Sequence, residues 1–238
     1  VYASSVTIWR DVEGVLALSP RWTLPARNLS NLSYTEAAEL AVFSQPMLHP
    51  SAVEPLRELG IPLNLRPLHS PEDDGTIIGP SIRLETPCVR AVGCLPRQVQ
   101  FSWSLSGAIS LTECVTDAMS ALARARIQVS SIHAQPGNVQ LLISSRMAAR
   151  ARRILSAQPS LPTPEIGDSV SILCFVGEGI GEDCDLWGTI AKHADSSGID
   201  FQFSEQEPRP HAIHAFVPAN QTEWALQTLC SALDLLSQ

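Results

Sequence analysis

Lysine, aromatic side chains and long apolar runs are all scarce in this sequence. Lys192 is the single lysine, and aromatic residues make up 5% of the chain. No apolar run comes near the ~20 residues that a membrane-spanning helix needs, so we expect no membrane partner. The 238 residues are 45% hydrophobic, which is enough to bury a core in one large domain or two smaller ones.

Positive charge is also in short supply. Twenty-four acidic residues stand against 16 basic ones, and the formal net charge is −8. Such a surface repels phosphate backbones unless its cations are concentrated in one place. The composition therefore predicts that nucleic acid is not a partner.

The six cysteines include no Cys-x-x-Cys pair, and we expect no secretory leader ahead of them. We therefore expect reduced, mostly packed thiols in a cytoplasmic protein. The sequence opens at Val1, within what reads as a strand, without a methionine or a polar lead-in. We expect it to be a piece of a longer protein.

Motifs that would specify a reaction are missing. His211 and His214 are three apart on a predicted strand, so they point to opposite faces and cannot chelate one metal ion from that strand. The glycine-rich run 177–181 carries Glu178 where a phosphate would need amides and cations, which favours a tight turn before a helix. We predict no catalytic residue and no metal ligand in this chain.

The first 80 residues read as the end of an α/β domain. A strand is expected over 6–9, and Ser33 and Glu36 have the spacing of a capping box that opens a helix. A second helix is expected over 51–59 and a strand over 61–65, with a linker beginning near residue 79.

From residue 88 onward, short strands alternate with single helices, and the order repeats. The pattern predicts helices over 111–126, 147–157, 186–197 and 221–236, with strands over 99–105, 127–132, 139–143, 170–176, 199–203 and 212–217. Two successive βαββα units are typical of ferredoxin-like modules. The expected fold class is thus α/β followed by α+β, and the open sheet face or edge of each unit favours pairing.

One set of segments resembles a known family. The sequence over 9–15, 19–21, 34–40, 48–50, 60–63 and 75–78 is similar in order and spacing to the C-terminal part of the aspartokinase catalytic domain. In that family two ACT domains follow, which are βαββαβ modules that sense amino acids. The resemblance implies an amino-acid-kinase-type domain end over 1–80, a first ACT-like domain over 81–165 and a second over 166–238.

The resemblance also implies an activity. The whole enzyme would transfer the γ-phosphate of ATP, with Mg²⁺, to the β-carboxylate of aspartate, which opens the route to lysine, threonine and methionine. Phosphoryl transfer depends on positioning and on neutralising phosphate charge. The family's Lys-Phe-Gly-Gly-Thr-Ser motif does not occur in these residues, so we expect no catalysis from this segment alone.

Three nucleotide-contacting positions of the family keep the family residue: Asp11, Gly14 and Arg21. Arg10 replaces a threonine, and Pro46 replaces the lysine that faces the nucleotide. Proline offers neither a charge nor a backbone N–H. Asp11, Gly14 and Arg21 form an expected nucleotide-binding remnant.

The family's effector, lysine or threonine, is held near the first ACT strand, the start of the next helix and the following strand. The corresponding positions here are Ala108, Leu111, Cys114, Val115, Val129 and Ser130. They are candidate effector-binding residues. The alternative is that they serve only as packing surface of the module.

Two functions therefore stay open. The chain is expected to be the regulatory C-terminal portion of an aspartate kinase, pairing as a homodimer through its ACT domains. The alternative is a non-catalytic ACT-domain regulatory or assembly subunit that has lost nucleotide and effector binding. A stand-alone amino-acid sensor is disfavoured because it has no use for a kinase-domain end.

Overall fold

The computed structural model describes residues 3–43, 50–80, 86–105, 107, 109–204 and 209–237. The chain forms two compact units. The first unit combines Val1–Leu95 with Leu173–Val217 and Gln221–Gln238, and the second contains Pro96–Ile172 and Pro218–Asn220. The chain thus leaves the first unit along one strand and returns to it along another. Within the described ranges, no helix is long and apolar enough to cross a membrane.

The kinase-like part of the first unit is built on a four-stranded sheet of order β1-β5-β6-β4. Its strands are β1 (Val6–Arg10), β4 (Asn31–Ser33), β5 (Leu63–Pro67) and β6 (Thr76–Gly79). The β1–β5 and β4–β6 pairs are parallel, whereas β5 and β6 are antiparallel. A small ladder accompanies the sheet, formed by β2 (Val15–Leu16) and β3 (Asn28–Leu29) around the 3₁₀ turn η1 (Pro20–Trp22).

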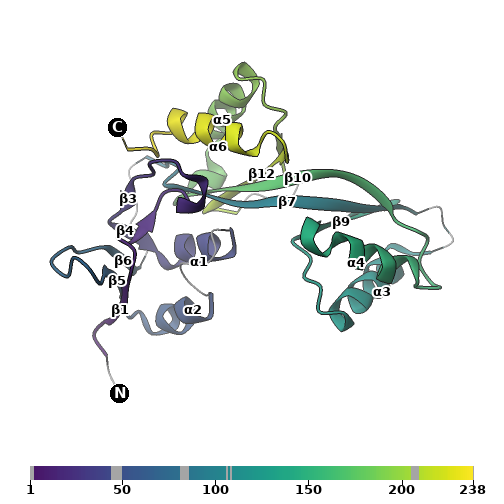
Figure 1. Cartoon of the computed structure of the whole chain (residues 1–238), viewed down its shortest axis with the longest axis horizontal. Coiled ribbons are helices and arrows are strands. Elements are labelled where there is room, and N and C mark those ends of the chain that lie inside the picture. Colours follow the sequence, from purple (N-terminus) through teal and green to yellow (C-terminus); the bar gives the residue numbers. More distant parts are fainter. Residues whose placement is uncertain are drawn as a thin grey trace. The chain divides into compact units, whose positions relative to one another are not determined.

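Two helices complete this part, α1 (Tyr34–Phe43) and α2 (Pro50–Leu59), which lie next to each other (Figure 1). Helix α1 begins with the predicted capping box. The Ser33 amide donates to Glu36 Oε2 at 2.8 Å, and the Glu36 amide donates to Ser33 Oγ at 3.1 Å. The prediction is confirmed, and α1 therefore starts at a fixed residue.

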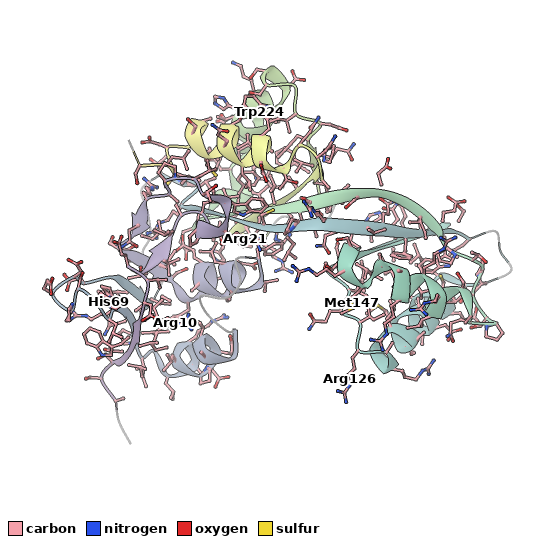
Figure 2. All side chains as sticks on the ribbon, in the orientation of Figure 1. Arg10, Arg21, His69, Arg126, Met147 and Trp224 are labelled. Carbon is pink, nitrogen blue, oxygen red and sulfur yellow. The ribbon has the colours of Figure 1, made fainter. Side chains whose placement is uncertain are left out.

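The other part of the first unit is a ferredoxin-like module. Its elements are the end of β10 (Glu165–Val176), η2 (Ile180–Glu182), α5 (Cys184–Ser196), β11 (Gln202–Phe203), β12 (Ala212–Pro218) and α6 (Thr222–Ala232). Helices α5 and α6 pack together (Figure 1). Helix α6 ends four residues before the predicted boundary because Asp234 adopts φ 58°, a left-handed conformation that stops the helix. Trp224 does not pack in the core, since 53% of it is exposed (Figure 2).

The second unit contains β7 (Ala91–Ser104), α3 (Leu111–Arg124), β8 (Ser131–Gln135), β9 (Asn138–Ser144), α4 (Ser145–Ser156) and the start of β10. Strands β7 and β10 pass from one unit to the other within a sheet of order β11-β12-β10-β7-β9-β8. Strand β8 begins later than predicted because the chain after α3 turns through Arg126 at φ 55°.

Side chains that point to one face of β7 and β9 form the hydrophobic core of the second unit. Phe101 and Trp103 pair with Leu141 and Val139, and all four side chains are buried in the core. On β7 the intervening positions, such as Gln100 and Ser102, are polar and lie on the opposite face. In β7 this alternation follows Pro96 and Arg97, and Arg97 adopts φ 53° at the point where the strand enters the second unit.

The glycine-rich run 177–181 is a tight turn before helix α5, as the sequence predicts. A Cβ atom at Gly181 would overlap the carbonyl oxygen of Arg209, whereas one at Gly188, inside α5, would have no atom within 4 Å.

We expect Gly181→Ala to lower the free energy of unfolding by about 1–3 kcal/mol through overpacking. Gly188→Ala is the matched control and should raise it by about 0.5–1 kcal/mol, because alanine favours a helix interior. Urea unfolding of both variants tests this, and equal effects would contradict it.

Candidate functional site

Gly14 lies where the backbone passes close to strand β6. It adopts φ 129°, and a Cβ atom there would be 2.6 Å from Thr76 Oγ1. That hydroxyl accepts a hydrogen bond from the Val15 amide at 2.8 Å and donates one to the Leu29 carbonyl at 2.6 Å. Glycine at this position is therefore required by the local packing of the first unit.

The other two nucleotide-remnant residues have separate partners. The Asp11 side chain is 82% exposed, with Oδ1 4.0 Å from His69 Nε2. The Arg21 guanidinium donates to the Cys94 carbonyl and lies 5.0 Å from the centroid of the Trp22 ring. Figure 2 shows Arg21 and His69 in different places on the first unit. Pro46 lies outside the described residues.

These contacts do not fit a bound nucleotide. A phosphate site needs convergent amides and cations, and the one retained cation, Arg21, already binds a backbone carbonyl. Asp11, Gly14 and Arg21 are thus not gathered into a set that would hold ATP and Mg²⁺ within the described part of the chain. No step of phosphoryl transfer follows from them.

The candidate effector residues lie in the second unit. Leu111, Val115 and Val129 pack against its hydrophobic core, and Cys114 is a core residue with no exposed surface. Ser130 is different, because it is exposed and its hydroxyl donates to Gln98 Oε1 at 2.8 Å. Ala108 lies outside the described residues. The structure therefore brings four apolar positions together as packing and leaves Ser130 as a polar group at the surface.

The start of α3 carries a second capping box, which the sequence analysis missed. Glu113 Oε2 accepts from the Ser110 amide at 2.9 Å, and the Glu113 amide donates to Ser110 Oγ at 3.2 Å. Hydrogen bonds from the Ser110 hydroxyl and amide lower the pKa of the Glu113 carboxyl. The Ser-x-x-Glu spacing was the available signal.

A buried polar cluster lies where α1 meets the ferredoxin-like module of the first unit. Glu36 has no exposed surface, and its Oε2 is 3.2 Å from Arg90 Nη1. Arg90 also donates to the backbone and side-chain oxygens of Asn31. Burial raises the pKa of Glu36, while the positive charge of Arg90 and the hydrogen bonds from Ser33 oppose that rise.

Charged side chains and histidines of the same module, together with Glu39 of α1, extend this cluster. His211 Nδ1 lies 2.8 Å from Glu178 Oε2, and the negative charge of Glu178 adds to the rise in the pKa of Glu36. Arg209 Nη1 lies 2.8 Å from Glu39 Oε1. Burial lowers the pKa of His214, which packs against the ring of Phe43. Sequence spacing could not reveal the cluster, because its members come from distant segments.

Comparison with known proteins identifies the family. No family model matches the chain. It is 26% identical over 240 residues to the bifunctional aspartokinase/homoserine dehydrogenase of Haemophilus influenzae, covering 97% of this chain and 29% of that protein. It is 31% identical over 191 residues to bifunctional aspartokinase/homoserine dehydrogenase 1 of Zea mays, covering 74% and 21%. The chain belongs to the aspartokinase family.

Solved aspartokinase structures show the same fold. Escherichia coli aspartokinase III in complex with aspartate and ADP matches with a TM-score of 0.79 at 22% identity, covering 98% of this chain and 53% of that one. The aspartate kinase of Clostridium acetobutylicum gives 0.83 at 20% identity, covering 97% and 54%. The predicted fold class is confirmed, with a kinase-domain end followed by two ACT-like modules. The aspartokinase-family chain spans only part of each relative's length.

The buried carboxyl of Glu36 makes stability depend on pH. Its pKa in the folded protein lies above the ordinary 4.5, so its contribution is complete below that value and is lost as pH rises through the folded pKa. Glu36→Gln keeps an acceptor oxygen and cannot ionise. We expect the unfolding free energy of the wild type to fall relative to this variant as pH rises, by about 1.4 kcal/mol for each unit of elevation.

Chemical denaturation at a series of pH values measures this difference. Glu58→Gln, at an exposed position of α2, controls for the loss of one acidic residue. A wild-type-to-variant difference that is constant from about pH 4 to 8 would show that burial does not govern Glu36.

Proposed function

We propose that the chain is the regulatory C-terminal portion of an aspartate kinase, an enzyme that phosphorylates L-aspartate with ATP in the biosynthesis of lysine and related amino acids. The observation that carries this is the extent of the match. Similarity covers 97% of the chain, from the kinase-domain end through both ACT-like modules. A free-standing sensor would not need the first of these parts.

Within this proposal the segment does not catalyse by itself. ATP and Mg²⁺ are cofactors of the whole enzyme, and the described residues offer no phosphate-binding set, since Arg21 is held by the Cys94 carbonyl. The same contact favours the alternative of a non-catalytic regulatory or assembly subunit. All six cysteines are unpaired, which suits a reducing compartment such as the cytoplasm.

We assign the regulatory role to the second unit, with lysine or threonine as the effector. A free amino acid brings an ammonium and a carboxylate, and both need polar partners when they leave water. Ser130 and Gln98 supply a hydrogen-bonded polar pair, and Ser130 directly follows Val129, which packs against the same core as Leu111 and Val115 of α3. A lysine complex of E. coli aspartokinase III is among the solved relatives.

The full open reading frame that encodes these residues tests the activity. We expect it to form aspartyl phosphate from aspartate and Mg·ATP, trapped as the hydroxamate, and the 238-residue segment to form none. Lysine or threonine should inhibit the full product. Ser130→Ala should weaken that inhibition, whereas Ser120→Ala, exposed on α3, should leave it unchanged. A full product without activity would overturn the kinase assignment and leave the regulatory-subunit alternative.

We further propose a homodimer formed through the ACT-like modules. Strand β8 is at one edge of the six-stranded sheet, where a second chain can extend the ladder. Sedimentation equilibrium should give twice the 25.7 kDa mass of one chain. Ala134→Lys places a charge on the exposed edge and should weaken the dimer, while Ala123→Lys on α3 should not. A monomer at all concentrations would refute the proposal.

A further inference from the structure

Three side chains from separate elements converge inside the first unit. Glu39 comes from α1, Cys174 from β10 and His214 from β12, and one donor atom of each lies within 4.8 Å of the other two. The Cys174 side chain has no exposed surface, and only 13% of the Glu39 side chain is exposed. A sulfur, a nitrogen and an oxygen donor therefore lie close together and are largely shielded from solvent.

We propose that Glu39, Cys174 and His214 bind a thiophilic divalent cation of the Zn²⁺ class. Thiolate, imidazole and carboxylate are the ligands that Zn²⁺ takes in proteins, at bond lengths of about 2.0–2.3 Å. Those bonds separate tetrahedral donors by roughly 3.4 Å, so modest side-chain rotations close the set. Three protein ligands leave a fourth position for water.

The histidine supplies an independent observation. Nε2 of His214 is buried and has no hydrogen-bond partner. Buried polar atoms in native proteins nearly always have a partner, and a bound cation would provide one. The Phe43 ring, whose centroid is 5.0 Å from that of His214, forms an apolar wall beside the imidazole.

The charges around the cluster are compatible with a cation. Arg209 Nη1 lies 2.8 Å from Glu39 Oε1, and its side chain is 59% exposed. A carboxylate has two oxygens, so an ion pair through Oε1 leaves the other oxygen of Glu39 as a potential ligand. Cation binding would displace a proton from the Cys174 thiol and create the thiolate ligand.

The cation would join helix α1 to two central strands of the ACT-like module, all within the first unit. The three ligand residues are separate from the nucleotide and effector positions, so the site is independent of the proposed kinase function.

Cobalt provides the spectroscopic test, because four-coordinate Co²⁺ has strong visible bands and a thiolate ligand adds a near-ultraviolet charge-transfer band. We expect the metal-free chain to bind one Co²⁺ with both signals, and Zn²⁺ to displace it and raise Tm. The experiment is repeated in a Cys88→Ser/Cys184→Ser background, which removes the two exposed thiols. Absence of both signals would overturn the proposal.

Two matched pairs of variants locate the site. Cys174→Ser should abolish the charge-transfer band, and Cys230→Ser, buried in the same unit, should retain it. Glu39→Gln should weaken Zn²⁺ binding by at least about tenfold. Arg209→Gln breaks the same ion pair without removing a ligand, so it should not weaken binding.

The second pair decides the matter if Cys174→Ser does not fold. A band that survives in folded Cys174→Ser would refute the site. Equal loss of Zn²⁺ binding in Glu39→Gln and Arg209→Gln would also refute it, because the ion pair and not the ligand would then be responsible.

Discussion

The buried pair of Arg90 and Glu36 is the contact on which the arrangement of the first unit depends. The Arg90 amide donates to the Val176 carbonyl at 2.8 Å, while its guanidinium binds the Glu36 carboxylate and the oxygens of Asn31. One residue thus connects the end of β10, the start of α1 and strand β4. A buried carboxylate without its partner would be strongly unfavourable, so this contact fixes where α1 can lie. The positions of Glu39 and Phe43, further along the helix, follow from it.

Local features could be predicted from the sequence because their partners are close in the chain. The Ser33 capping box, the tight turn at 177–181 before a helix and the strand at 139–143 could all be predicted from local patterns. Boundaries set by single backbone angles could not be predicted. Asp234 at φ 58° ends α6 early, and no pattern in its neighbours indicates that conformation.

The buried polar groups lay beyond sequence reasoning for a different reason. His211 lies just before strand β12 and not on it, contrary to the prediction, whereas His214 lies on that strand as predicted. Its actual neighbours, Glu39 and Cys174, come from distant segments that only the tertiary fold brings together. Likewise Arg21 matches a family motif by identity, yet its guanidinium donates a hydrogen bond to the backbone carbonyl of Cys94. A motif match fixes the residue type but not the group that it binds.

Arg97, whose backbone is in the left-handed conformation, divides β7 into two parts with different patterns of side-chain burial. Before it, Ala91 to Cys94 are buried on both faces, so that part of β7 carries no distinction between inner and outer sides. After it, Val99, Phe101 and Trp103 point inward and the residues between them do not. Because side chains alternate with a period of two, the loss of one residue here would exchange the apolar and polar sets of β7 and leave the preceding part unaffected. The residue at which β7 enters the ACT-like module thus decides which of its side chains form that module's apolar face and which its polar face.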